Sequence, residues 1–193
     1  MASEDTFGAR LAVRLRPMVP RKYCIETKRS LLYAISFDDE GELQLGQNSA
    51  LEPTRGGGTG FEQDLLLFER ASGGKAATSI IPRVSVELKV GGVTTHDSIV
   101  YSEKARRIRA IYPFVRYGLI LGGLDHIPGR TLRLGTEFDF IVAMPTPIRK
   151  ATLGRLGKLL RLELRLSRKL TAILRGRDKV AALHRSLRHF RKF

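Results

Sequence analysis

Two apolar segments in the first half of the chain constrain its fold more than any other feature of the sequence. The first, residues 61–68, reads FEQDLLLF, and the second, residues 83–90, reads RVSVELKV. Aliphatic and polar residues alternate along the second segment, which is the period of a β-strand. Both segments are therefore predicted to be strands, with Glu87 and Lys89 side by side on one face of the second. If the two strands pair, Asp64 on the first can approach Glu87.

The residues after the second strand predict a crossover connection. Thr94 and Asp97 have the spacing of a helix capping box. Residues 97–112 carry apolar side chains at helical spacing and precede Pro113, where a helix should stop. Residues 115–121 form another strand-like run, so strand, helix and strand predict a parallel pair in one sheet. Further strands are predicted at residues 42–46 and 137–142.

Other parts of the first 147 residues have different patterns. Residues 1–20 are polar and contain two prolines, so we expect an irregular start. Residues 21–37 have the apolar spacing of a helix. Residues 47–60, 71–82 and 122–136 are rich in turn-forming residues and are predicted to be connections.

Positive charge is concentrated at the end of the chain. Residues 149–193 hold 15 of the 34 Lys and Arg residues and 2 of the 19 acids, which leaves 19 basic and 17 acidic residues before them. Leucine, arginine and lysine dominate residues 148–175 and 178–191, and this composition favours helices although leucines alternate along part of the first. The 193 residues are therefore divided into a core, 1–147, and a basic C-terminal helical extension, 148–193.

Such a basic segment favours nucleic acid or another polyanion as a partner. Arginine outnumbers lysine 24 to 10, which suits bidentate contacts with phosphate groups. The leucines of the extension need a partner surface, and its cations can then face phosphates. The residues predicted to contact nucleic acid are Lys104, Arg155, Lys158, Arg161, Arg165, Arg168 and Lys169.

Several classes of protein are excluded or disfavoured. The single cysteine, Cys24, excludes an intrachain disulfide and fits a reducing compartment. No apolar run of about 18 residues is present, so no membrane span is expected. The first ten residues lack the apolar region of a signal peptide, and a cytoplasmic location follows as the expectation.

The order of the predicted elements carries a resemblance to a known family. An acid-bearing strand with Asp64, a strand with Glu87-Leu88-Lys89, a helix and a further strand resemble the PD-(D/E)xK nuclease superfamily, which includes many type II restriction endonucleases. The similarity covers about residues 21–121. It implies an α/β fold with a restriction-endonuclease-like mixed central sheet flanked by helices. The chain departs from the family pattern at Gln63, where the family has proline, and in its long connection between Asp64 and Glu87.

The chemistry of these side chains suits phosphodiester hydrolysis. Mg²⁺ held by oxygen ligands helps to deprotonate a water and stabilises charge on a phosphate. Asp64 and Glu87 would supply two carboxylates, and the backbone carbonyl of Leu88 could complete the set, with Mn²⁺ as an alternative ion. Lys89 would then lie near the attacking water or the scissile phosphate. The alternative is an ordinary exposed strand face at Glu87 and Lys89, with Asp64 capping a strand.

The Glu-x-Lys spacing is not diagnostic by itself, because Glu26 and Lys28 share it. In several members of the family, the resemblance implies, a glutamate of the first helix adds to the metal site. Glu26 could be that residue, although a solvated helix position is the simpler interpretation.

The sequence thus predicts a metal-dependent DNA endonuclease, of which restriction-type cleavage is one form. DNA is favoured over RNA, and cleavage of both strands would favour a homodimer because two strands need two sites. The first alternative is a catalytically inactive module that binds nucleic acid through its basic extension. The second is an assembly protein that contacts RNA or a partner through the same extension.

Overall fold

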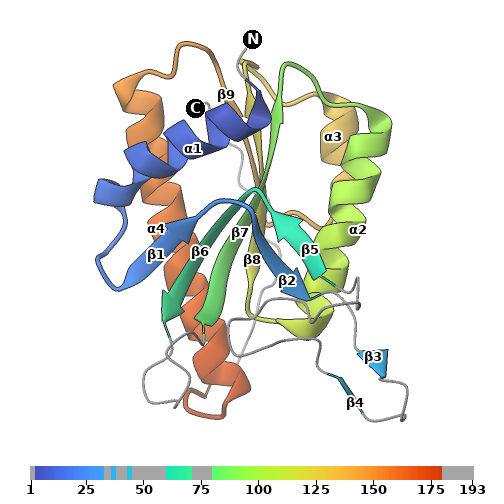
Figure 1. Cartoon of the computed structure of the whole chain (residues 1–193), viewed down its shortest axis with the longest axis vertical. Helices are drawn as coiled ribbons and strands as arrows, with labels where there is room; N and C mark the ends of the chain where they lie inside the picture. Colours follow the sequence, from blue (N-terminus) through green and yellow to red (C-terminus); the bar gives the residue numbers. More distant parts are fainter. Residues whose placement is uncertain (1–2, 33–35, 38–42, 45–59, 71–79, 180–193) are drawn as a thin grey trace.

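The computed structural model describes residues 3–32, 36–37, 43–44, 60–70 and 80–179. Its centre is a five-stranded sheet of order β1-β6-β7-β8-β9 (Figure 1). These strands are Tyr23–Glu26 (β1), Leu65–Arg70 (β6), Ile80–Val90 (β7), Arg116–Gly122 (β8) and Phe140–Met144 (β9). The pairs β1–β6 and β6–β7 are antiparallel, whereas the pairs β7–β8 and β8–β9 are parallel. The predicted α/β class, with a mixed sheet flanked by helices, is confirmed.

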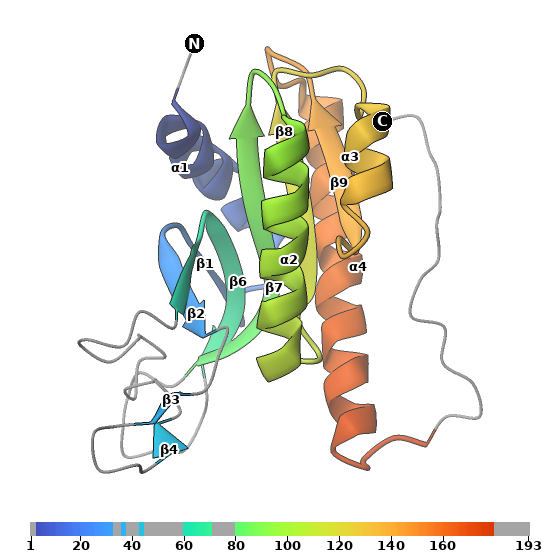
Figure 2. The ribbon, with the colours of Figure 1, turned by 90° about the vertical axis from the view of Figure 1, so that its right-hand side faces the viewer.

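Helices cover both faces of the sheet (Figure 2). One face packs against α1 (Glu4–Leu15) and α4 (Lys150–Leu174), and the other against α2 (Thr95–Ile111). The short α3 (Gly129–Leu134) lies beside α2, and the 3₁₀ turn η1 (Arg16–Met18) follows α1. Among the described helices, none is both long and apolar enough to cross a membrane.

The alternation predicted for β7 is confirmed by the two cores. Val84, Val86 and Leu88 are buried against α1 and α4, while Ser85 and Glu87 face the α2 side. All five side chains are buried because the strand is covered on both faces. Glu87 is therefore an acidic side chain that is buried on the α2 side of the sheet.

The predicted crossover is also confirmed. Thr94 and Asp97 form a reciprocal capping box, and α2 spans Thr95–Ile111. The chain then enters β8, which pairs in parallel with β7 and sets Glu87 opposite Leu119. The cap and the crossover fix α2 directly over the face of β7 that bears Glu87.

The prediction of an irregular start is wrong, because Glu4–Leu15 is a helix. Ser3 caps it by accepting a hydrogen bond from the amide of Thr6, and acids occupy its first turn, where they stabilise the helix dipole. Phe7, Leu11 and Leu15 recur every four residues and are buried in the core.

The predicted helix at 21–37 is wrong as well. The chain forms β1, then β2 (Arg29–Leu32) and β3 (Ser36–Phe37). β3 pairs with β4 (Leu43–Gln44), which confirms the short strand expected near residues 42–46. Short apolar runs fit either period, and pairing with distant strands decides between them.

The first of the two key strands is divided at Asp64. β5 (Gly60–Gln63) pairs with β2, whereas Leu65 begins β6 in the main sheet. The antiparallel pairing expected between β6 and β7 is confirmed, with Leu65 opposite Val86. Asp64 therefore stands where the chain passes from the small sheet to the central one.

The last third follows the predictions with smaller changes. The connection at 122–136 contains α3, and the last strand is Phe140–Met144 in place of 137–142. The first helix of the extension is confirmed as α4, and its buried leucines belong to the same core as α1 and β7. The boundary after residue 147 stays a prediction. The connections at 47–59 and 71–79, and the helix predicted at 178–191 beyond residue 179, lie outside the described residues.

Candidate functional site

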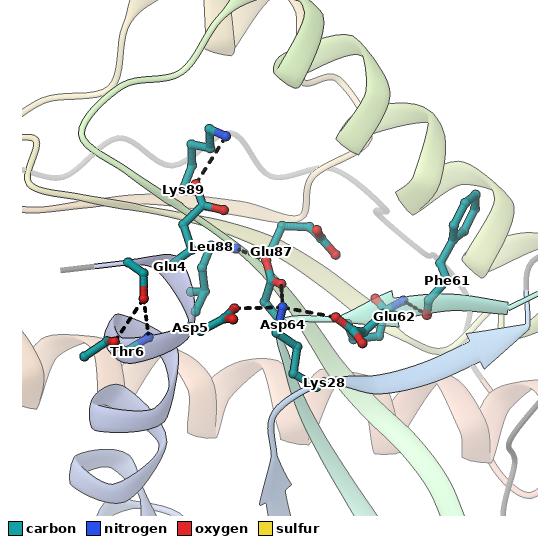
Figure 3. A network of polar contacts seen from close by, with 12 residues as sticks. Glu4, Asp5, Thr6, Lys28, Phe61, Glu62, Asp64, Glu87, Leu88 and Lys89 are labelled. Carbon is teal, nitrogen blue, oxygen red and sulfur yellow. Dashed lines mark hydrogen bonds and ion pairs between the residues drawn. The ribbon is translucent and has the colours of Figure 1, made fainter. Parts of the chain in front are cut away.

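Charged side chains gather at the carboxyl end of β7, between the starts of α1 and α2 (Figure 3). Six carboxylates and three lysines form three neighbouring groups of ion pairs there, one around each lysine. We call this group the acid–lysine cluster; it consists of Glu4, Asp5, Lys28, Glu62, Asp64, Glu87, Lys89, Asp97 and Lys104. All three residues predicted to be catalytic, Asp64, Glu87 and Lys89, belong to it.

Asp64 is held at the end of β6 by the neighbouring strand. Its Oδ2 accepts a hydrogen bond of 2.8 Å from the amide of Leu88. Because Leu65 pairs with Val86, the next residues, Asp64 and Glu87, come to the same end of the strand pair. In an antiparallel ladder the N–H and C=O of one residue point to the same neighbour, so the Leu88 carbonyl faces the same edge as its amide.

Glu87 is 2% exposed and has two partners on the α2 side of the sheet. Lys104 Nζ lies 2.7 Å from its Oε1, and the hydroxyl of Tyr117 donates to the same oxygen at 2.8 Å. Burial raises the pKa of Glu87, the Lys104 ammonium partly offsets this rise, and the charge of Asp64 adds to it. Burial and the adjacent Glu87 also raise the pKa of the Tyr117 hydroxyl.

Lys28 forms ion pairs with Asp64 and with two neighbouring acids. Its Nζ lies 2.9 Å from Asp5 Oδ1, 3.1 Å from Glu62 Oε1 and 3.8 Å from Asp64 Oδ1 (Figure 3). Hydrogen bonds to Asp5 and Glu62 raise the pKa of Lys28 well above its usual value. The backbone of Lys28 has φ 57°, a left-handed conformation uncommon outside glycine, at the bend between β1 and β2.

Lys89 joins the starts of two helices. Its Nζ is 3.2 Å from Glu4 Oε1 on α1 and 3.7 Å from Asp97 Oδ1 on α2. Desolvation alone would lower the pKa of Lys89, but the hydrogen bond to Glu4 and the nearby acids outweigh it, so the pKa is raised. Lys89 is thus a protonated ammonium that contacts acids other than Asp64 and Glu87.

The close approach of α1 to β7 depends on a glycine. A Cβ at Gly8 would lie 2.9 Å from Leu88 Cδ1, which is too short for a normal contact. The absence of a side chain at Gly8 lets the first turn of α1 reach the end of β7, where Glu4 and Asp5 meet their lysines.

Lys104, predicted from the sequence to contact nucleic acid, lies inside the cluster. Besides Glu87, its ammonium donates to the carbonyl of Glu62. Glu26, the other glutamate considered for the metal site, ends β1 and pairs with Arg29 at 2.8 Å. The structure therefore brings Lys104 to the candidate site and gives Glu26 a different partner.

The predicted nucleic-acid contacts of α4 lie elsewhere. Five of its cations line a groove beside the start of β1, whereas the exposed Arg155 is not part of its lining; the five are Lys158, Arg161, Arg165, Arg168 and Lys169. The cluster and the groove are separate features of the surface.

Sequence reasoning missed several members of the cluster. Glu4 and Asp5 were assigned to an irregular start, and Lys28 to a helix. The Ser3 cap followed by Phe7, Leu11 and Leu15 was a signal for α1 that the prolines obscured. No comparable local signal marks Glu62 or Tyr117, because each reaches the cluster through strand pairing.

The donor atoms of the site suit a small divalent cation. No three Asp, Glu, His or Cys side chains in the described ranges are grouped so as to hold a metal ion by themselves. Asp64, Glu87 and the Leu88 carbonyl nevertheless offer hard oxygens at one sheet end. Mg²⁺ commonly uses one or two protein carboxylates and completes its shell with water and substrate phosphate, so these oxygens are donors of the chemical type that Mg²⁺ binds.

The sequence was compared with known families and proteins. No protein-family model matches the chain, and no curated protein gives a significant match.

Proposed function

We propose that the protein is a metal-dependent endonuclease that hydrolyses phosphodiester bonds in DNA. The observation that supports this best is the meeting of Asp64 and Glu87 at one end of paired strands, beside the backbone of Leu88. The proposal includes a restriction-endonuclease-like form of the observed α/β fold and a cytoplasmic location. DNA remains favoured over RNA, and a homodimer is proposed for cleavage of both strands.

Different hydrogen-bond donors position the carboxylates of Asp64 and Glu87. The Leu88 amide orients Asp64, while Tyr117 and Lys104 orient Glu87. Asp64, Glu87 and the Leu88 carbonyl would hold Mg²⁺ or Mn²⁺. The bound ion would acidify a water and stabilise negative charge on the phosphate.

Two lysines, Lys89 and Lys104, are candidates for the catalytic cation. Lys89 is the residue expected from the Glu-x-Lys pattern, but its ammonium lies against Glu4 and Asp97. Lys104 contacts Glu87 directly. An ammonium near a scissile phosphate stabilises developing negative charge, so both residues are proposed to support the reaction, and separate variants distinguish them.

The test is a cleavage assay with supercoiled plasmid and labelled oligonucleotides in Mg²⁺, Mn²⁺ or EDTA. Asp64→Asn, Glu87→Gln, Lys89→Met and Lys104→Met should each lower the cleavage rate by about 100-fold or more, the scale of a lost general-acid, general-base or electrostatic contribution. Glu26→Gln is the matched control, because it makes the same change at the other glutamate of a Glu-x-Lys tripeptide, and Glu26 pairs with Arg29 outside the cluster. Circular dichroism verifies that each variant is folded.

Either of two outcomes of the cleavage assay would contradict the proposal. Absence of cleavage with every metal, or full cleavage by Glu87→Gln, would remove the endonuclease assignment. The second candidate, an inactive nucleic-acid-binding module, is favoured by the lysine partners that already neutralise Asp64 and Glu87. Tight binding without cleavage would establish that candidate.

A further inference from the structure

A groove of about 660 Å³ lies between α4 and the segment that leads from η1 into β1. Among the residues that the structure describes, six cations line it and no acidic side chain does. The cations are Lys22, Lys158, Arg161, Arg165, Arg168 and Lys169. A cationic groove of this kind attracts polyanions and concentrates them at the surface.

The spacing of the α4 cations places them along one stripe. Lys158, Arg161, Arg165 and Arg168 follow one another at three or four residues, so they share a helix face. The leucines that enter the core lie on an adjacent face of the helix, and one of them, Leu164, also lines the groove. From Lys158 to Lys169 the helix rises by about 16 Å at ~1.5 Å per residue, comparable with four or five steps of ~3.4 Å along one nucleic-acid strand.

One carboxylate, Glu69, forms ion pairs with three cations at or near the groove. Its Oε2 lies 2.9 Å from the buried Arg83, and its Oε1 lies 3.9 Å from Lys22 and 3.6 Å from Arg168. A single negative charge faces three positive ones there. The groove therefore keeps a net positive charge after this internal pairing.

The remaining groove cations differ in their partners. Arg161 donates to the Met18 carbonyl at 2.6 Å, an uncharged acceptor, and Lys169 pairs with Asp178. Lys158 and Arg165 are exposed and have no ion pair within the described part of the chain.

We propose that this groove binds the phosphate backbone of a nucleic-acid strand, at a site separate from the acid–lysine cluster. The inference rests on the proposed function for the identity of the ligand as nucleic acid. Tyr23 at the groove pairs with Glu69 in β6, and Asp64, just before the first residue of β6, is five residues from Glu69 along the chain. At ~3.3–3.4 Å per residue, the groove is about 17 Å from the candidate site, and a bound strand passes the β1 edge to reach both.

The experiment measures fluorescence anisotropy of labelled single-stranded and duplex 20-mers in EDTA, so that no metal-dependent cleavage occurs. The test variant is Lys158→Gln/Arg165→Gln, which removes two exposed charges without breaking an ion pair of the described residues. The matched control is Arg130→Gln/Arg133→Gln on α3, which removes two exposed charges away from the groove. Urea denaturation should give the same midpoint for both variants as for the wild type.

We expect the groove variant to bind at least tenfold more weakly at 100 mM salt. The slope of log affinity against log salt should become shallower by about 1.4–1.8, from about 0.7 to 0.9 for each lost phosphate contact. The control should retain the wild-type affinity and slope. Equal binding by the groove variant and the wild type would overturn the inference, as would tighter binding of a poly-glutamate peptide than of either oligonucleotide.

The outcome is separable from that of the proposed function. Charge-dependent binding at the groove without any cleavage would support the groove and remove the endonuclease. Metal-dependent cleavage with wild-type binding by the groove variant would support the endonuclease and remove the groove.

Discussion

The acid–lysine cluster and the α4 groove differ in how their charged side chains are paired. In the cluster, three lysines face six carboxylates and each lysine contacts at least one of them. In the groove, six cations surround a region where Glu69 is the nearby acid shared by Lys22 and Arg168. Every lysine of the cluster is paired with an acid inside the protein and the acids are in excess, whereas the groove keeps positive charge for an external partner. The formal net charge of +15 therefore does not distinguish the two regions, but the local pairing of charges does.

The largest expected difference between the two regions is in stability. Lys104→Met leaves the buried Glu87 carboxylate without its ammonium, and breaking such a pair from one side costs about 3 kcal/mol. Arg165→Met removes an exposed groove cation and should change the free energy of unfolding by less than about 0.5 kcal/mol. Urea denaturation at pH 7 measures both values.

A double variant sharpens this comparison. Glu87→Met/Lys104→Met removes the whole buried pair and should recover a large part of the lost stability, because no charge is left unpaired. Equal losses for Lys104→Met and Arg165→Met would show that the paired lysine of the cluster contributes no more to stability than an exposed groove cation.

A smaller effect is expected for metal affinity. Lys28 lies among Asp5, Glu62 and Asp64, so its ammonium repels a divalent cation from Asp64. Lys28→Met should tighten Mn²⁺ binding about fivefold, equivalent to roughly 1 kcal/mol. Isothermal titration calorimetry measures the affinity, with Lys22→Met of the groove as a control that should leave it unchanged. Weaker Mn²⁺ binding by Lys28→Met would mean that Lys28 supports the site.

The smallest effect is a pair of opposite pH dependences inside the cluster. Burial raises the pKa of Glu87, so the folded protein binds a proton more tightly than the unfolded chain. Stability from this group therefore falls as pH rises above about 4.3 and levels off above the raised pKa. Partial burial would raise the pKa of Asp97, but hydrogen bonds from Thr94 lower it. Its contribution is present above about 3.9 and is lost as pH falls through the lowered pKa.

Urea midpoints between pH 2.5 and 8 test these signs. Glu87→Gln should flatten the fall in stability toward neutral pH, and Asp97→Asn should flatten the loss in acid. Identical profiles for the two variants would contradict the assigned directions.

The parts of the fold that sequence predicted are those set by local periods. The alternation of β7, the Thr94–Asp97 cap and the composition of α4, rich in leucine, arginine and lysine, each belong to one element. Adjacent strands then explain why Asp64 and Glu87 could be expected near each other. Those predictions needed only the chain order and the antiparallel pairing of neighbours.

The failures involve partners that are distant in sequence. Tyr23–Glu26 and Arg29–Leu32 form strands because Tyr23 pairs with Glu69 and Leu31 with Phe61, and no local spacing encodes these choices. Lys28 joins the cluster through a left-handed bend that its residue type does not favour. Glu4 and Asp5 join it because α1 docks through Gly8. These contacts arise from the assembly of separate elements.

The two faces of α4 impose different limits on how this sequence can change. Leu153, Leu156, Leu160 and Leu164 fill the core, so substitutions at these positions alter packing and are costly. The exposed cations between them can gain or lose charge at little cost to folding. The strength of polyanion binding can therefore drift or be engineered in small steps along this helix, while the scaffold that holds the cluster stays the same.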